Sequence, residues 1–165
     1  MGNLKRDLKR SNFLVKPSYI LICYRIGNTI YYSNIPKLIK RLLLVVLKVI
    51  YTIFCIIPFN SEILFETRIG EGLKLIHPFG IIISKHATIG KDCTIFQFVT
   101  IGAVDKQGIS NKAPRIGNNV YIGAGAKILG DIEIGDNVKI GANTVVTKNV
   151  PDNCTVVGSN RILKN

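Results

Sequence analysis

The chain has 165 residues, the size of one ordinary domain, and carries 22 Lys or Arg against 10 Asp or Glu, a net charge of +12. Residues 1–58 hold ten of these bases and one acid, so the N-terminal third has a charge of +9. Such a charge suits an anionic partner, but no zinc-finger spacing, aromatic RNA-binding motif or helix-turn-helix pattern accompanies it, which argues against nucleic acid. A solvated basic face and a surface of anionic lipids both stay open as explanations.

The first third is predicted to be helical. Residues 12–30 and 35–57 are the expected helices, and the turn residues within 31–36 separate them. Residues 42–57 are apolar, but Lys48 interrupts them, and sixteen residues fall short of the ~20 that a membrane-spanning helix needs. We expect this stretch to pack on the rest of the protein or on another subunit, with binding to a membrane surface as the alternative.

The four cysteines form no paired motif, and with only two histidines they offer no plausible zinc site. We therefore expect reduced thiols and no metal. The chain begins with polar and charged residues and shows no signal-peptide pattern, so a cytoplasmic location is expected, with peripheral contact at the inner face of the plasma membrane as an option.

A six-residue period dominates the remaining two thirds. One unbroken row is Ile116, Ile122, Ile128, Ile134, Ile140 and Val146. Earlier rows run through Ile83 and Ile69, and the offset between them implies a small insertion near His77. Neither a helix nor a simple strand brings every sixth residue to an equivalent place, whereas a solenoid of short strands and tight corners does. The pattern predicts an all-β solenoid in which three hexads close each coil.

Residues 103–115 interrupt this rhythm and are expected to leave the coil as an extruded loop, a common place for function. The chain is thus divided into a basic, apolar helical segment (1–58) and a β-helix (59–165). The helical segment and the C-terminal tail are the expected caps of the stack.

Two stretches, residues 69–102 and 116–158, resemble the serine acetyltransferase branch of the hexapeptide-repeat acyltransferases, and the runs HPFGI and GAGAKILG are the most specific matches. The opening DLKRSNFLVKPSYILICYR and the ending VPDN resemble more closely the short acetyltransferases of surface-polysaccharide synthesis, of the colanic-acid type. The resemblance implies a left-handed parallel β-helix, a homotrimer with active sites between adjacent subunits, acetyl-CoA as donor, and a histidine base at the position of His77.

Acetyl transfer to an alcohol needs a base for the hydroxyl proton and a donor for the oxyanion. His77 is the candidate base, since imidazole titrates near neutrality, while His86 is expected to be a surface residue. Glu62 lies fifteen residues upstream, where the resembled family has an acid that pairs with the histidine, and Glu66 is its competitor. Backbone N–H groups near Gly102 are the candidates for binding the oxyanion.

Coenzyme A is long and polyanionic, and the candidate contacts for it are Gly125, Ala126, Lys127 and Arg161. The serine-specific enzymes that the chain resembles carry an Asp directly before the histidine and an Arg-His pair in the loop. Here the substrate-facing positions are Ile76, Lys112 and Ala113. Because Ile76 offers no charge to an ammonium group, we expect a sugar hydroxyl as acceptor, in surface polysaccharide biosynthesis. A serine O-acetyltransferase of cysteine biosynthesis and a non-catalytic β-helix scaffold are the alternatives.

Overall fold

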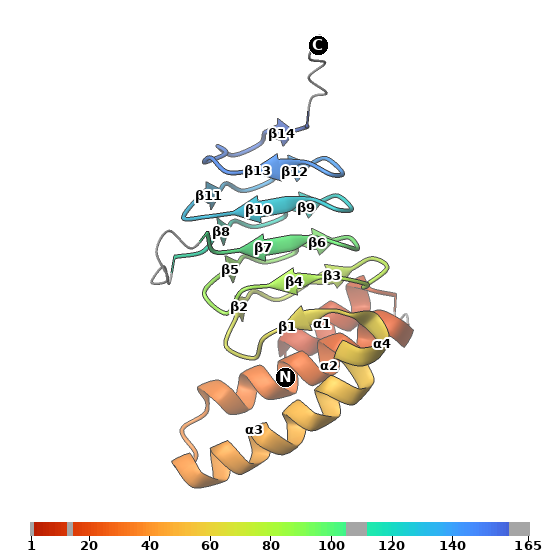
Figure 1. Ribbon diagram of the computed structural model, residues 1–165, viewed down its shortest axis with the longest axis vertical. Helices are drawn as coiled ribbons and strands as arrows, with labels where there is room; N and C mark the ends of the chain where they lie inside the picture. Colours follow the sequence, from red (N-terminus) through yellow and green to blue (C-terminus); the bar gives the residue numbers. More distant parts are fainter. Residues whose placement is uncertain (1, 13–14, 105–111, 159–165) are drawn as a thin grey trace, which may run out of the picture.

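The computed structural model describes residues 2–12, 15–104 and 112–158. Helices form its N-terminal part and lie at the end of the molecule away from the C-terminus (Figure 1). They are α1 (Gly2–Arg10), α2 (Val15–Tyr32), α3 (Lys37–Tyr51), the π-helical turn η1 (Thr52–Ile56) and α4 (Ile57–Phe59). The break between α2 and α3 falls within the expected turn. The helix α1 was not expected, because its nine mostly charged or polar residues offer only two large apolar side chains, Leu4 and Leu8, to mark a buried face.

Fourteen short strands follow. They are β1 (Glu62–Ile63), β2 (Arg68–Ile69), β3 (Lys74–Leu75), β4 (Ile82–Ile83), β5 (Thr88–Ile89), β6 (Thr94–Ile95), β7 (Thr100–Gly102), β8 (Arg115–Ile116), β9 (Tyr121–Ile122), β10 (Lys127–Leu129), β11 (Glu133–Ile134), β12 (Lys139–Ile140), β13 (Val145–Val146) and β14 (Thr155–Val156). From β1 to β13 successive strands enter three sheets in turn, an isolated bridge between Ile134 and Val150 stands in for the next strand of sheet B, and β14 joins sheet C. All the strand pairings among the described residues are parallel. Sheet A has the order β1-β4-β7-β10-β13, sheet B β11-β8-β5-β2, and sheet C β14-β12-β9-β6-β3. This arrangement fits the solenoid predicted from the repeat and the left-handed parallel β-helix implied by the family resemblance.

The repeat works because every sixth residue points into the coil. In sheet A, Ile83, Ile101, Ile128 and Val146 lie in register on neighbouring strands. Each has at most 4% of its surface exposed, so each isoleucine packs on those of the coils above and below. The six-residue spacing is thus the sequence form of a stacked apolar core.

Asparagine ladders hold the corners between sheets B and C. The side-chain amide of Asn119 donates to Asn137 at 2.9 Å, and that of Asn137 donates to Asn153 at 3.0 Å. All three residues have φ values between 54° and 59°, a left-handed conformation that asparagine tolerates better than most residues. Asparagine therefore serves these tight corners twice, through its backbone conformation and through its side-chain ladder.

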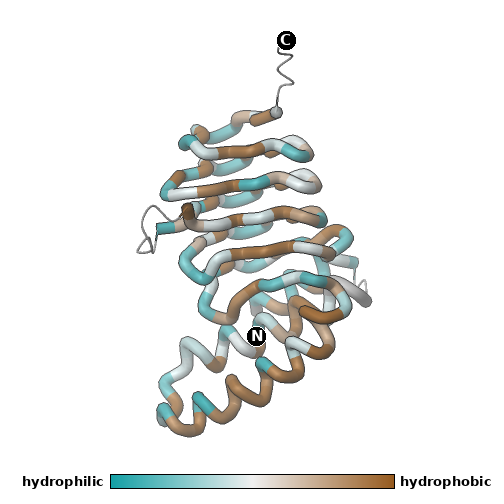
Figure 2. The backbone as a smooth tube through the Cα atoms, in the orientation of Figure 1, coloured by the Kyte–Doolittle hydropathy of each residue, from teal (hydrophilic) through white to brown (hydrophobic). Residues whose placement is uncertain are grey.

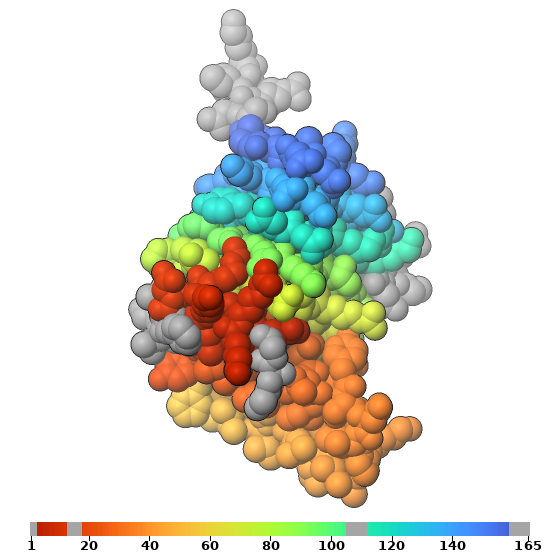
Figure 3. Space-filling model, turned by 180° about the vertical axis from the view of Figure 1, so that it is seen from behind, coloured from red at the N-terminus to blue at the C-terminus, as the bar shows by residue number. Residues whose placement is uncertain are grey.

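The N-terminal helices are fastened to the first coils by a buried ion pair. Asp7 is fully buried and accepts hydrogen bonds from Arg25 Nε at 2.7 Å and from the backbone N–H groups of Gly72 and Leu73 at 2.7 and 2.9 Å. Arg25 also donates to the carbonyl of Ile69 at 2.7 Å. Figure 3 shows α1 (red) lying against the side of these coils.

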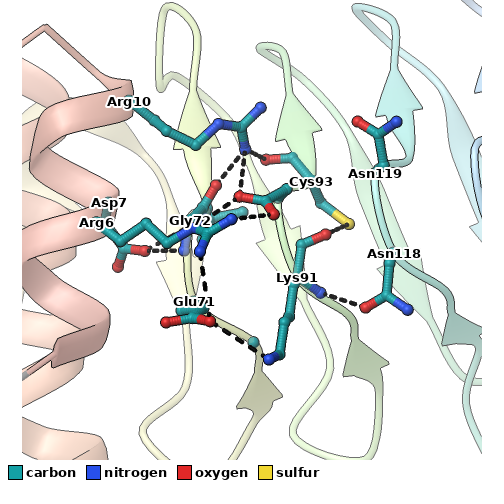
Figure 4. Close-up of polar contacts among 12 residues, drawn as sticks. Arg6, Asp7, Arg10, Glu71, Gly72, Lys91, Cys93, Asn118 and Asn119 are labelled. Carbon is teal, nitrogen blue, oxygen red and sulfur yellow. Dashed lines mark hydrogen bonds and ion pairs between the residues drawn. The ribbon is translucent and has the colours of Figure 1, made fainter.

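Further charges lie near Asp7, where α1 meets the first coils (Figure 4). Arg6 pairs with Asp92 at 2.6 Å and with Glu71 at 3.6 Å, and Arg10 lies 3.8 Å from Asp92. Lys91 completes the group by pairing with Glu71 at 3.3 Å. The bases of α1 are thus partly used to dock the helix, which accounts for some of the N-terminal charge without an external partner.

The third helix is more exposed than expected. The continuous helical stretch Lys37–Phe59 has 23 residues and is long and apolar enough to cross a membrane by length and composition alone, and only 11% of its most apolar window is buried in the molecule. The sixteen residues counted from the sequence were the apolar run 42–57 alone, whereas the helical stretch begins at Lys37 and ends at Phe59. The outer face of this stretch does not pack on the described residues of its own chain, and its packing on another subunit or on a membrane surface stays a prediction.

Candidate active site

His77 lies in a corner that is longer than its neighbour. The corner between β3 and β4 spans residues 76–81, whereas the equivalent corner of the next coil spans residues 96–99. The strands on both sides stay in register, so two extra residues must bulge from the coil. This is the insertion that the offset rows indicated, and it leaves the His77 side chain exposed.

The backbone at His77 is strained. Its φ is 48°, a left-handed conformation that costs a non-glycine residue energy and is often held at functional sites. Two residues after His77, Phe79 closes a tight turn by donating its N–H to the His77 carbonyl at 2.6 Å. By contrast, His86 is an exposed residue in the corner after β4.

Glu62 opens β1, directly below β4. Its backbone N–H donates to the carbonyl of Ile81 at 2.7 Å, which places the residue just beyond the corner that carries His77. The Glu62 side chain is exposed and lines a hollow that it shares with Glu66 and Lys48. Within the described chain, no hydrogen bond or ion pair joins Glu62 to His77, so the orienting role of this carboxylate stays a prediction.

The corners that connect sheet C to sheet A stack on one another and form what we call the His77 edge, residues 76–81, 96–99, 123–126 and 141–144. Backbone bonds join successive corners, as from Phe98 N to the Phe79 carbonyl at 2.7 Å and from Gly125 N to the Gln97 carbonyl at 2.9 Å. The structure therefore brings His77 to the same edge as Gly125, Ala126 and Lys127.

The three coenzyme-A candidates on the His77 edge differ in what they can offer. Ala126 is fully buried, so its methyl group faces the core. Gly125 has a φ of 74°, and a Cβ there would lie 2.0 Å from Asn143 Oδ1, which requires glycine for the corner itself. The Lys127 ammonium donates to the Phe98 carbonyl at 2.6 Å and to Thr100 Oγ1 at 3.1 Å, so it already holds the corner below. The fourth candidate, Arg161, lies outside the described residues.

Gly102 and Lys112 lie at a different edge. Gly102 ends β7, where the chain leaves sheet A, and β8 begins only at Arg115. Of the loop expected here, residues 103–104 and 112–114 belong to no strand, and residues 105–111 lie outside the described part of the chain. Before β8, Lys112 pairs with Asp131 at 3.0 Å, and this contact is the main cause that lowers the pKa of Asp131. We call residues 84–87, 102–104, 112–114 and 130–132 the Gly102 edge.

Three residues of the His77 edge were missed. Phe79 and Phe98 are 36% and 57% exposed beside the candidate base, and the side-chain oxygen of Gln97 is buried without a hydrogen-bond partner among the described residues. The run FQF at 96–98 places aromatic residues in a corner where the repeat usually has small or polar ones. This departure was the sequence signal that could have identified these residues. An exposed aromatic pair and an unsatisfied amide suit a bound organic ligand.

Among the described residues, no group of three or more His, Cys, Asp or Glu is arranged to hold a metal ion. The four cysteines are unpaired; Cys55 and Cys93 are buried, and Cys23 and Cys154 are partly exposed. Burial raises the pKa of the Cys93 thiol to about 11. None of the four lies on the His77 edge.

A repeat β-helix with an exposed histidine in an inserted corner defines a class of transferases, and comparisons with known proteins agree. Residues 113–148 match the family described as bacterial transferase hexapeptide (six repeats). A serine acetyltransferase of Helicobacter pylori is 38% identical over 141 residues, which cover 86% of this chain and 77% of that protein. The chain belongs to the hexapeptide-repeat transferase family.

The relatives within this family are named serine acetyltransferases. The enzyme of Synechococcus elongatus is 40% identical over 138 residues, 84% of this chain and 52% of its own, so the chain spans about half of that relative. The Neisseria gonorrhoeae serine acetyltransferase in complex with serine has a TM-score of 0.77 at 31% identity, over 95% of this chain and 66% of its own. A serine acetyltransferase in complex with CoA has a TM-score of 0.74 at 29% identity, over 94% and 64% of the two chains.

These findings correct the expected acceptor. The assignment to polysaccharide O-acetyltransferases is wrong, because the relatives and the structural neighbours are consistently serine acetyltransferases. The expectation rested on Ile76, Lys112 and Ala113, and each has a role in the fold. Ile76 is half-buried and donates its N–H to the Ile95 carbonyl at 2.8 Å, Lys112 pairs with Asp131, and Ala113 is buried. Their side chains therefore say little about the acceptor.

Proposed function

We propose that this chain is an acetyl-CoA-dependent serine O-acetyltransferase whose coils wind left-handed. The observation that carries the proposal is the exposed, strained His77 in the inserted corner of a chain that shares 40% identity over 138 residues with a serine acetyltransferase. Because acetyl-CoA is the proposed donor, the protein is also proposed to act in the cytoplasm.

In the proposed reaction, the His77 imidazole takes the proton of the serine hydroxyl as the oxygen attacks the thioester carbonyl of acetyl-CoA. The tetrahedral intermediate carries a negative charge that backbone N–H groups near Gly102 would stabilise. Its collapse breaks the C–S bond, and the proton held by His77 passes to the departing thiolate of CoA. The carboxylate of Glu62 is proposed to fix the imidazole tautomer.

The positions of His77 and Gly102 support a site shared by two subunits. His77 precedes sheet A and Gly102 follows it, so within one chain they lie at opposite ends of the sheet. In the coil that begins with β4, Gly80 lies before the strand and Ser84 lies after it. Four extended steps of the chain separate these two residues, a distance of ~13 Å. The imidazole of His77 and the N–H groups near Gly102 in one chain therefore cannot contact the same acetyl group. They could do so if the His77 edge of one subunit lay beside the Gly102 edge of the next. We propose a homotrimer on this ground.

The His77 edge also supplies a path for the donor. Phe79 and Phe98 offer exposed rings beside His77, and the corner containing Gly125 continues the edge. Aromatic rings of this kind can pack on the adenine or the pantetheine arm of CoA. The Lys127 ammonium adjoins this path, since it donates to the Phe98 carbonyl at 2.6 Å.

The test is release of CoA thiol from acetyl-CoA by the purified full chain, with and without L-serine. We expect serine-dependent release, and we expect His77→Ala to lower kcat by about 10²–10⁴, the usual contribution of a general base. Lys91→Ala is the control, because it removes an exposed side chain from the corner between β5 and β6, outside both edges, and should leave kcat unchanged. Binding of acetyl-CoA without any serine-dependent release would overturn serine as the acceptor, and equal rates for His77→Ala and Lys91→Ala would overturn the role of His77.

A further inference from the structure

The outward face of α3 is a continuous apolar stripe. Residues spaced three and four apart along a helix share one face, and here they are Leu38, Leu42, Val45, Val49, Ile53 and Ile57. All six are exposed, and the two ends of the stripe, Leu38 and Ile57, are 71% exposed. Figure 2 shows the hydrophobic colouring along this helix, at the end of the molecule away from the C-terminus. An apolar patch of this length on the surface indicates a partner.

The opposite face fixes α3 to the rest of the chain. Tyr51 is 3% exposed, accepts a hydrogen bond from the Ile63 backbone N–H at 3.0 Å, and packs on the ring of Phe65 at 5.3 Å. Cys55 is fully buried. Since this face is already occupied, the stripe cannot turn inward, and α3 presents it permanently to the surroundings.

Cations line one flank of the stripe. Lys37, Arg41 and Lys48 border a groove with Tyr31 and Val45, next to the apolar residues. Among the described residues, none of these three bases forms an ion pair or a hydrogen bond through its side chain. Residues 1–58 contain a single acid, Asp7, which is buried and paired with Arg25. No carboxylate of the helices therefore neutralises Lys37, Arg41 and Lys48.

We propose that the outward face of α3 binds the surface of a bilayer that contains anionic lipids, with the helix lying parallel to that surface. The stripe would enter the boundary between headgroups and acyl chains, while the flanking bases contact lipid phosphates. Long basic side chains beside an apolar face can extend to the headgroups in this way.

Two observations favour this occupant over others. A second copy of α3 packed on the stripe would bring Lys37, Arg41 and Lys48 against identical bases, and like charges across an interface oppose association. A membrane-spanning arrangement would place Lys48, the twelfth residue of the 23-residue helical stretch, near the centre of the bilayer, where a charge is costly. A helix lying on an anionic surface avoids both problems.

The first test measures binding of the full chain to vesicles of phosphatidylcholine with and without phosphatidylglycerol, by flotation at several salt concentrations. We expect binding only with the anionic lipid, weakened by salt. Replacing Arg41 by Ala should lower the partition coefficient roughly fivefold, and replacing Lys48 as well should lower it roughly twenty-five-fold, if each base near the surface contributes ~1 kcal/mol. Val49→Glu should abolish binding, whereas Val157→Glu, at a valine of the far coil that is 69% exposed against 54% for Val49, should not.

The second test uses the absence of tryptophan from the sequence. Three variants, Leu38→Trp, Val49→Trp and Ile57→Trp, place a single fluorophore along ~28 Å of helix, and Val157→Trp is the matched control. Lipids brominated at different depths quench the three helix probes to the same shallow extent if α3 lies on the surface. Deep quenching at residue 49 with shallow quenching at the ends would instead show a spanning helix and overturn the proposal.

Failure to bind anionic vesicles would also overturn it, and a Val49→Glu variant that changes the oligomer mass in light scattering without any vesicle binding would assign the stripe to a second copy. These readouts do not use acetyl transfer, so their outcome is independent of the proposed function.

Discussion

The buried pair of Asp7 and Arg25 makes a quantitative prediction about how the helices are held. Asp7→Ala removes the acceptor for the Arg25 guanidinium and for the backbone N–H groups of Gly72 and Leu73, all of them buried or nearly so. Breaking a buried ion pair at one partner typically costs 3–5 kcal/mol, because the remaining charge stays buried and uncompensated. We therefore expect Asp7→Ala to lower the free energy of unfolding of the full chain by about 3–5 kcal/mol.

The assay is equilibrium unfolding in urea at a fixed protein concentration, with a double-mutant cycle that adds Arg25→Ala. The double variant should be less destabilised than the sum of the single variants, because the second substitution removes the orphaned charge. Arg6→Ala is the control, since it removes an exposed ion pair with Asp92 that solvent and salt screen. If Asp7→Ala cost less than about 1 kcal/mol, the reasoning that this pair fastens α1 to the coils would be refuted.

Two further predictions concern single positions. Gly125→Ala should destabilise the fold by about 1–3 kcal/mol, since φ is 74° and the new methyl carbon would lie 2.0 Å from Asn143 Oδ1. In urea unfolding, adding Asn143→Ala should recover part of the lost free energy of unfolding. The Cys55 thiol donates a hydrogen bond that lowers the pKa of Cys23 to about 7. Because the reactive thiolate forms above the pKa, alkylation of Cys23 should reach half its maximal rate near pH 7. Cys55→Ala should move that midpoint to higher pH, as read by mass spectrometry of the labelled peptide, and an unchanged midpoint would contradict the contact.

The stacked core was predictable because its cause is local and repeated. Each isoleucine of the row from Ile116 to Ile140 predicts the same inward position six residues later, so one row determines the direction of every side chain in those coils. The offset near His77 was equally readable, since a change in register can only be absorbed by extra residues in a corner. These features need no knowledge of contacts between distant segments.

The docking of α1 could not be predicted in the same way. Asp7 and Gly72 are 65 residues apart, and the bond between them depends on where α2 places Arg25. A short, highly charged sequence gives no signal that one of its carboxylates is buried. The exposure of α3 was missed for a related reason, because an apolar helix has the same sequence whether its outer face meets protein or lipid.

Both candidate edges of the site coincide with breaks in the repeat. Residues 76–81 add two residues to one corner, and twelve residues of sequence separate β7 from β8 at another. A stacked core tolerates such additions only at corners, where extra residues can point outward without leaving a gap inside. Because consecutive corners of one coil lie at different edges of the solenoid, two functional insertions on one chain are held apart. A reaction that needs both is therefore best served by the edges of two neighbouring subunits.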